Sequence, residues 1–172
     1  MEWLTGTELY RTVILEGVLR ATRSVWIATA NLKDLYVPSA RRRYRPILEQ
    51  FGAMARDGIQ IRVIHSELPS RSFRDTFDSL PALVDGGLEL QICPRSHWKM
   101  VIVDGLLGYC GSANFTGAGL GAKSHANRNL ELGAVGRDPE FVTMLERTFD
   151  AFWMGDACEG CGRRDICPDP IR

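Results

Sequence analysis

The chain contains no long apolar run: its hydrophobic stretches have the length of a β-strand, and none approaches the roughly 20 residues that a membrane-spanning helix needs. Charge of one sign is not in excess either, because 21 lysine and arginine residues balance 21 aspartate and glutamate residues. This balance excludes a global field that would attract nucleic acid or a membrane surface, so any such partner must bind a local patch. Histidine is also scarce, with three residues in 172, which leaves few candidates for imidazole chemistry.

A secretory signal is likewise missing. Met1 is followed directly by Glu-Trp-Leu-Thr-Gly, with neither the basic nor the apolar segment of a signal peptide. We therefore expect a soluble, cytoplasmic protein, and the lack of an amphipathic membrane helix or a lipidation signal argues against a membrane partner. The five cysteines, an odd number, favour metal or thiol chemistry over a disulfide framework in that compartment.

The pattern of apolar residues predicts helices that alternate with strands. Helical spacing, together with proline or an N-cap at the helix starts, indicates helices over residues 7–22, over residues 46–56, and from Asp138 onward. Strand-like segments are residues 25–30, 59–64, 88–92, 99–103, 106–110 and 130–135. Residues 31–45 are expected to form a loop, and residues 66–85 an irregular, partly helical connection. The predicted fold class is α/β, a mixed β-sheet flanked by helices over residues 1–154, followed by a cysteine-rich tail over residues 155–172.

One stretch, HWKMVIVDGLLGYCGSAN, carries most of the chemical information. It opens with H-x-K-x4-D, formed by His97, Lys99 and Asp104. Because side chains alternate faces along a strand, we expect His97 and Lys99 on one face and Trp98 on the other. The imidazole can then meet a phosphorus atom while the ammonium holds one of its oxygens. Asp104 ends the strand and is expected to hold the turn or the neighbouring backbone.

Two more polar side chains follow the next strand. Ser112 and Asn114 stand on the same side just past its end, where a hydroxyl and an amide can donate to one anion. A surface histidine and lysine beside a turn aspartate is the alternative for H-x-K-x4-D alone, and the added G-S-x-N argues against it. The stretch therefore combines a nucleophile, a cation and hydrogen-bond donors, which are the groups that cleavage of a phosphodiester requires.

The complete spacing, H-x-K-x4-D-x6-G-S-x-N, resembles the signature of the phospholipase D superfamily, and the order of elements agrees over residues 5–154. A further family element, Asn-x-Glu on the following strand, is similar to Asn129-Leu130-Glu131. The resemblance implies a phospholipase D-like fold and phosphodiesterase chemistry. It leaves the substrate open, because members of the family cleave phospholipids, cleave nucleic acids or transfer phosphatidyl groups.

The resemblance also implies roles for individual residues. His97 attacks phosphorus to give a phosphohistidine, Lys99 and Asn114 bind the phosphoryl oxygens, and Ser112 supports them. Glu131 hydrogen-bonds the far nitrogen of His97 and fixes its tautomer; a solvent-facing strand residue is the alternative. No catalytic divalent metal is expected, since lysine and amide donors supply the charge. The predicted catalytic residues are His97, Lys99, Asp104, Ser112, Asn114 and Glu131.

The implied mechanism needs two histidines, because one attacks while the other protonates the leaving oxygen and later activates water. His65 and His125 lack a lysine at the right offset and are expected to be loop or rim residues, which leaves His97. We therefore expect a homodimer in which two copies of His97 meet at a two-fold axis. Single-motif members of the family, which are mostly nucleases, form such dimers.

Cysteines with ligand-like spacing lie in the tail. Cys158, Cys161 and Cys167 form C-x2-C-x5-C; Cys93 is the preferred fourth ligand and Cys110 the alternative. The spacing resembles the iron–sulfur staple of certain helicase-associated and CRISPR-associated exonucleases. It is wider than that of usual zinc knuckles, so we predict a structural [4Fe–4S] cluster, with structural zinc or unliganded thiols as alternatives.

The densest basic run, R-R-R-Y-R, falls in the predicted loop over residues 31–45. Arginines around a tyrosine suit phosphate contacts and base stacking, although a solvated surface loop is the alternative. A lysine and an arginine that flank His125 add charge nearby. The predicted nucleic-acid-binding residues are Arg41, Arg42, Arg43, Arg45, Lys123 and Arg128.

These features favour a metal-independent nuclease that cleaves DNA or RNA in a homodimeric composite site. A phospholipase or cardiolipin hydrolase with the same catalytic atoms is the first alternative, and a non-catalytic nucleic-acid-binding module is the second. The choice between DNA and RNA stays open, as does participation in a larger nuclease or defence complex.

Overall fold

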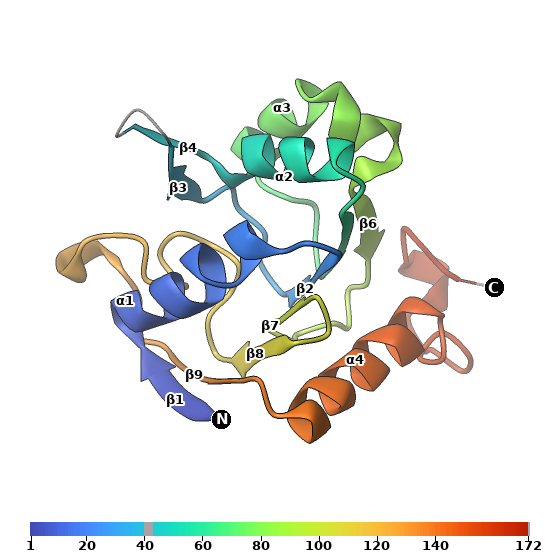
Figure 1. The fold of residues 1–172 in the computed structure, drawn as a ribbon. Coiled ribbons are helices and arrows are strands. Elements are labelled where there is room, and N and C mark those ends of the chain that lie inside the picture. The colour runs from blue at the N-terminus through green and yellow to red at the C-terminus, as the bar shows by residue number, and fades with distance from the viewer. Residues whose placement is uncertain (40–42, 172) are drawn as a thin grey trace.

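The structure is a computed structural model that describes residues 1–39 and 43–171. Within these residues the chain builds a seven-stranded sheet with the order β1-β9-β8-β7-β2-β5-β6 (Figure 1). Its strands are β1 (Glu2–Thr5), β2 (Ser24–Thr29), β5 (Gln60–His65), β6 (Glu89–Ile92), β7 (Met100–Val103), β8 (Leu107–Gly111) and β9 (Leu132–Gly136). A separate two-stranded ribbon pairs β3 (Tyr36–Pro38) with β4 (Tyr44–Pro46).

Helices and short helical turns connect these strands. They are α1 (Gly6–Leu9), η1 (Tyr10–Leu15), η2 (Val18–Arg20), α2 (Ile47–Arg56), α3 (Arg71–Asp78), η3 (Leu83–Gly87), η4 (His125–Asn127), α4 (Pro139–Trp153) and η5 (Arg164–Ile166). None of the helices in the described residues has the length and apolar character that crossing a membrane requires.

The sheet is mixed, as predicted. Strands β2, β5 and β6 run parallel to one another, whereas each neighbouring pair from β2 through β7, β8 and β9 to β1 is antiparallel. The C-terminal ends of β2, β5, β6 and β8 therefore lie together with the N-terminal ends of β7 and β9. We call this the carboxyl end of the sheet. Ligands of open α/β sheets commonly bind at such an end.

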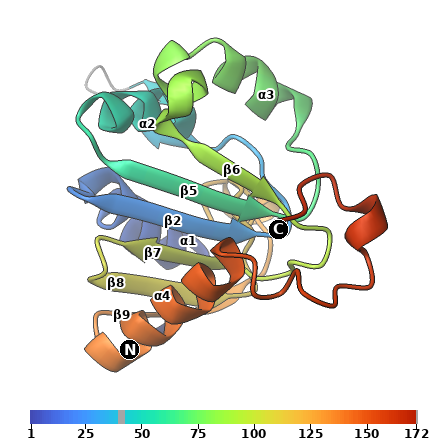
Figure 2. The same ribbon diagram turned by 90° about the vertical axis from the view of Figure 1, so that its right-hand side faces the viewer.

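Two hydrophobic cores lie on the two faces of the sheet. Along β7, Val101 and Val103 belong to the core beneath α1, η1 and α2, while Met100 and Ile102 belong to the core beneath α4. This split follows from the alternation of side chains along a strand, and all four residues are at most 5% exposed. The central strands are thus covered on both faces, which holds the loops at the carboxyl end on a rigid base (Figure 2).

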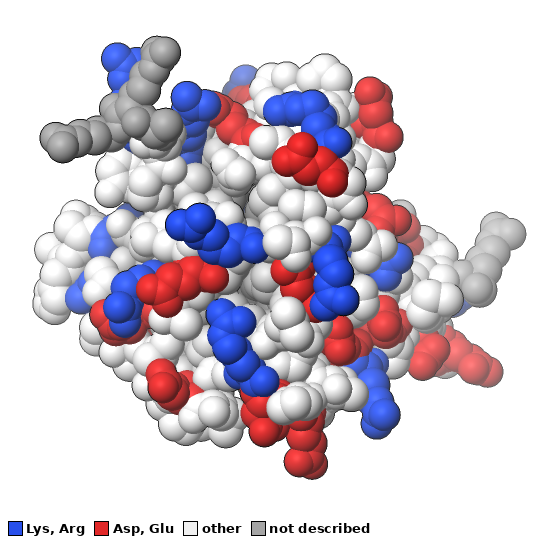
Figure 3. All heavy atoms as spheres, in the orientation of Figure 1, with Lys and Arg blue, Asp and Glu red and all other residues white. Residues whose placement is uncertain are grey.

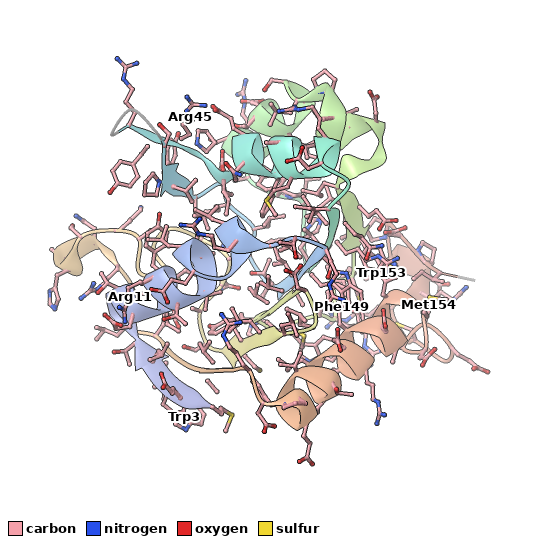
Figure 4. The ribbon with its side chains drawn as sticks, viewed as in Figure 1. Trp3, Arg11, Arg45, Phe149, Trp153 and Met154 are labelled. Atoms are coloured by element: carbon pink, nitrogen blue, oxygen red, sulfur yellow. The ribbon has the colours of Figure 1, made fainter. Side chains whose placement is uncertain are left out.

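The last helix begins as its sequence indicates. The Asp138 carboxylate accepts a hydrogen bond from the Phe141 backbone N–H at 3.0 Å, and proline occupies the first helical position. Farther along, Phe149 stacks on Trp26 of β2 at 5.2 Å between ring centroids and on Trp153 at 5.8 Å. Figure 4 shows Phe149 and Trp153 along α4. This aromatic stack fixes α4 against the sheet.

Some elements differ from the prediction. The helix expected over residues 7–22 begins at Gly6 but breaks into α1, η1 and η2. Strand β1 was not predicted, and all of the β3–β4 ribbon except Pro46 lies within the expected loop over residues 31–45. Both are short, and each strand of the ribbon ends in proline, so no local signal marks them.

The tail after α4 returns to the carboxyl end of the sheet. The backbone N–H of Ile92, the last residue of β6, donates to the Asp169 carboxylate at 3.2 Å. Figure 2 shows this segment beside the ends of β2, β5 and β6. The two parts that the sequence separates, residues 1–154 and 155–172, are therefore in contact.

Candidate active site

His97 and Lys99 lie just before β7, at the carboxyl end of the sheet. The Lys99 Nζ is 3.2 Å from Nδ1 and 3.4 Å from Nε2 of His97, and it donates to the His97 carbonyl oxygen at 2.8 Å. Trp98 points the other way and packs edge-on against Phe152 of α4 at 5.0 Å. The predicted alternation is thus present, and it places an exposed imidazole beside an ammonium group.

Lys99 is half-buried, and its surroundings affect its charge. Burial lowers the pKa of the ammonium, and the nearby Glu131 carboxylate opposes that change. Its hydrogen bonds go to the carbonyl oxygen and the ring nitrogens of His97 rather than to a carboxylate. The positive charge is therefore held next to His97 in a form that can receive an anion.

Ser112 follows β8 and is tied to the start of β9. Its hydroxyl donates to the Glu131 carboxylate and accepts from the Leu132 backbone N–H at 3.1 Å. The other oxygen of Glu131 accepts from Asn129 Nδ2 at 3.0 Å. Asn129, Glu131 and Ser112 thus form one hydrogen-bonded network across the ends of two neighbouring strands.

The predicted hydrogen bond between Glu131 and His97 is absent from the described residues. β9 is separated from β7 by β8, so the neighbour that Glu131 reaches is Ser112 and not the imidazole. Glu131 is nevertheless close enough to influence the charge of Lys99. In this structure Glu131 accepts a hydrogen bond from Ser112 and favours the charged form of Lys99.

Asn114 is held by Thr29 and Asn31, which belong to no motif in the sequence. Its Oδ1 accepts from the Asn31 backbone N–H at 3.0 Å and from the Thr29 hydroxyl at 3.3 Å. A backbone N–H can only donate, so this contact identifies the oxygen of the amide. The Nδ2 group is left as a donor for an anion. Thr29 ends β2 and Asn31 follows that strand, and only tertiary structure brings them to Asn114.

Asp104 lies at the opposite end of β7. Its carboxylate accepts from the backbone N–H groups of Thr22 at 2.9 Å, Arg23 at 2.7 Å and Ser24 at 2.9 Å, and from the Thr22 hydroxyl at 3.0 Å. Burial alone would raise the pKa of Asp104, but these hydrogen bonds outweigh it and hold the pKa below its ordinary value. Asp104 adopts a left-handed backbone conformation, with φ of 57°. It anchors the start of β2 and lies away from the imidazole.

A groove of about 460 Å³ runs on from Asn114 and Asn129. Its walls carry two lysines and two tyrosines, Lys33, Lys123, Tyr36 and Tyr44. The tyrosine side chains are well exposed, at 52% for Tyr36 and 67% for Tyr44. Cations and aromatic faces therefore line the approach to the site.

The predicted nucleic-acid-binding residues are dispersed. Lys123 lines the groove, whereas Arg45 pairs with Glu49 of α2 at 3.6 Å and Arg128 packs against Gly6. Arg43 lies between the two strands of the ribbon, and Arg41 and Arg42 fall outside the described residues. Figure 4 shows Arg45 near the ribbon, and Figure 3 shows basic and acidic side chains interspersed over that face. The structure does not gather these residues into one basic patch among the described residues.

Four cysteines line one small cavity of about 20 Å³ between the tail and the loop after β6. They are Cys93, Cys158, Cys161 and Cys167. Cys110, the alternative fourth ligand, lies on β8 and does not line it. In the part of the chain that the structure describes, no three histidine, cysteine or acidic side chains are arranged to hold a metal ion. The arrangement of these side chains therefore does not support a preformed metal site in the tail.

Basic side chains adjoin this cavity. Hydrogen bonds from the Arg163 backbone and then from the Arg95 side chain lower the pKa of the Cys161 thiol. Arg163 also donates to the Pro94 carbonyl at 3.1 Å. Arg95 thus joins the loop after β6 to the tail through a contact that favours the thiolate form of Cys161.

Comparison with known proteins places these observations in a family. The family described as "Cardiolipin synthase, PLD-like domain" matches residues 14–153. The major cardiolipin synthase ClsA of Bacillus subtilis (strain 168) is 35% identical over 71 residues, which cover 35% of this chain and 15% of that protein. A cardiolipin synthase of Staphylococcus aureus (strain N315) is 27% identical over 127 residues, which cover 66% of this chain and 25% of that protein. The chain thus spans at most a quarter of the length of these relatives.

Solved structures share the fold. NucT from Helicobacter pylori superposes with a TM-score of 0.61 at 16% identity and covers 88% of this chain and 94% of that chain. Nuc from Salmonella typhimurium, a phospholipase D family member, superposes with a TM-score of 0.57 at 17% identity. The match covers 88% of this chain and 93% of that chain. The fold predicted from the motif resemblance is confirmed. Since the family match extends over most of its length, the chain belongs to the phospholipase D superfamily, in the family of PLD-like domains named after cardiolipin synthase.

Proposed function

We propose that this protein is a metal-independent nuclease that cleaves a phosphodiester through a phosphohistidine at His97. The observation that carries the proposal is the exposed imidazole beside the Lys99 ammonium, with Ser112 and Asn114 on the adjoining strand ends. An attacking nitrogen, a cation and amide and hydroxyl donors are the groups that phosphoryl transfer needs.

The proposed reaction has two steps. The imidazole of His97 gives its electron pair to phosphorus, and the bond from phosphorus to the leaving oxygen breaks. A second histidine gives its proton to that oxygen. This histidine then takes a proton from water, whose oxygen attacks the phosphohistidine and releases free imidazole. Throughout, Lys99 Nζ and Asn114 Nδ2 bind the non-bridging oxygens, so a divalent metal has no necessary role.

The second histidine comes from a second copy of the chain. His65 ends β5 but is 1% exposed, so it is buried rather than a rim residue, and burial lowers its pKa. His125 is exposed in η4, outside the motif. Leu130, next to Glu131, is 95% exposed. An apolar side chain so open beside the site fits an interface that a second copy covers.

This dimer has a direct test. Leu130→Asp places a charge in the proposed interface, and we expect it to convert a dimer into a monomer and to remove cleavage activity. Molecular mass from light scattering measures the first effect. Met144→Asp is a matched control, because Met144 is 49% exposed on α4. An active, monomeric wild-type protein would contradict the composite site.

The groove supports nucleic acid as the substrate. Tyr36 and Tyr44 offer faces on which bases stack, and Lys33 and Lys123 offer charge for the backbone that leads to the cleaved phosphate. A phospholipase or cardiolipin hydrolase is the second candidate, which the curated relatives, named as cardiolipin synthases, favour. Their names describe the longer proteins, and this chain aligns with a fraction of each.

A cleavage assay in EDTA separates these functions. DNA, RNA and cardiolipin-containing vesicles are incubated with the wild-type protein, with His97→Ala and with the control His125→Ala. We expect cleavage of nucleic acid by the wild type and the control, and none by His97→Ala. Cleavage of vesicles alone would establish the lipid alternative. Cleavage that persists in His97→Ala, or no cleavage of any substrate, would overturn the proposal.

A further inference from the structure

The thiols of the tail meet a fourth thiol from elsewhere in the chain. Cys158, Cys161 and Cys167 come from residues 155–171, and Cys93 comes from the loop after β6, yet all four line one cavity. The cysteines are free, so no disulfide uses them. Convergence of four free thiols from two distant segments points to a shared ligand.

The tail also lacks the means to hold itself in place by apolar packing. None of its described residues is buried, and η5 is its single helical element among them. A segment of this size without a core commonly depends on a metal or on disulfides for its structure. The cysteines of the described tail form no disulfide, and a metal is a staple that free thiols can hold.

We propose that Cys93, Cys158, Cys161 and Cys167 bind a metal centre through four thiolates, as a [4Fe–4S] cluster or a zinc ion. Thiolates are preferred ligands of both. The guanidinium groups of Arg95 and Arg163 next to the cavity offset the negative charge that four thiolates bring. Binding draws the sulfurs from the cavity lining to one centre, as occurs in sites that form together with their metal.

The two occupants have the same ligand chemistry but different requirements. The separation C-x5-C is wider than in usual zinc knuckles and favours the cluster. The cavity volume of about 20 Å³ has room for a single ion once the thiols move inward to ligate it, whereas a cluster also requires the tail to move outward. The metal and sulfide content of the purified protein therefore decides between zinc and the cluster.

The metal centre has a structural role for the active site. Three contacts already connect the tail with residues 92–95: Asp169 to Ile92, Ala157 to Arg95, and Arg163 to Pro94. This segment leads directly to His97. The role of the centre is therefore structural: it fixes the tail against the loop that precedes His97 and does not contact the substrate.

The test measures metal in the full-length protein purified without oxygen. We expect either iron with an equal amount of inorganic sulfide and a broad visible absorption, or one zinc per chain. Cys161→Ser and Cys93→Ser are expected to lose this metal, whereas the matched control Cys110→Ser keeps it. A metal-free wild-type protein, or equal metal content in all variants, would refute the centre.

The structural role has its own readout. Removal of the metal is expected to lower the melting temperature and to speed proteolysis of the tail while the sheet stays folded. Unchanged melting and proteolysis after complete removal would contradict that role. These measurements do not use the nuclease assay, so the inference stands or fails independently of the proposed function.

Discussion

The two ends of β7 belong to one sequence motif but differ in construction. At its start, His97 is exposed and its ring contacts a lysine side chain. At its end, the Asp104 carboxylate accepts hydrogen bonds from three successive backbone N–H groups and a hydroxyl. One end leaves polar groups open to a ligand, and the other satisfies them within the protein. Regular spacing within a motif therefore does not mean that all its residues share a task.

This contrast assigns chemistry to the start of the strand and stability to its end. Polar groups held open at the site cost little when removed, because solvent already reaches them. A carboxylate that organises buried backbone donors leaves those donors unpaired when it is removed. Substitutions at the two ends of β7 should therefore change different properties: cleavage at the start and stability at the end.

Lys99→Gln removes the cation beside His97 and keeps the length of the side chain. We expect cleavage to fall about 100- to 1000-fold, as for loss of a donor that stabilises transition-state charge. The free energy of unfolding should change by less than about 0.5 kcal/mol, because the hydrogen bonds of the lysine all go to His97, which is exposed. Single-turnover kinetics and urea unfolding measure the two quantities. A large loss of stability with normal kinetics would reverse the assignment.

Asp104→Asn should show the opposite behaviour. One carboxylate oxygen becomes an NH2 group facing N–H donors, so we expect the free energy of unfolding to fall by about 1–3 kcal/mol. Cleavage per folded molecule is expected to stay near that of the wild type. Urea unfolding at pH 7 gives the first value, and an active-site titration normalises the second. Asp57→Asn, at the C-terminal end of α2, serves as the control.

The pH dependence sharpens this result. Because the folded state lowers the pKa of Asp104, ionisation of this group stabilises the wild type above the ordinary value of 3.8. That contribution is lost as pH falls through the lower pKa of the folded state. The stability difference between wild type and Asp104→Asn should therefore be largest near neutral pH and shrink below about pH 4. A difference that is constant from pH 7 to pH 3 would contradict this account.

Thr22→Val is expected to have the smallest effect. It removes the hydroxyl that donates to Asp104 but keeps the backbone N–H at the same position. We expect a loss of about 1 kcal/mol or less, with unchanged cleavage. In double-mutant cycles with Asp104→Asn, the two effects should be less than additive, since the two side chains share one hydrogen bond.

The sequence contained most of the information about the site. Spacing along the chain placed His97 and Lys99 on one face and Trp98 on the other, because a strand alternates its side chains over a short distance. It also placed Asp104 at a turn. The mixed sheet with flanking helices followed from the periodicity of the apolar residues.

Contacts between segments that are distant in the sequence were harder to predict. Thr29 and Asn31 hold Asn114 from more than 80 residues away in the chain, and no pattern in the sequence indicates that pairing. The contact of Glu131 with Ser112 was not predicted, because it depends on the pairing of β8 with β9. Strand β1 was missed for a related reason: its pairing with β9 joins the two ends of the domain.

The central claim is that two copies of His97 complete one site, and a mixed dimer tests it most directly. Wild-type and His97→Ala subunits with different affinity tags are produced together, and dimers that carry both tags are isolated. If one subunit attacks phosphorus and the other protonates the leaving oxygen, the mixed dimer should be as inactive as the dimer in which both subunits carry His97→Ala. Activity at half of the wild-type level would show that each subunit works alone and would contradict the shared site.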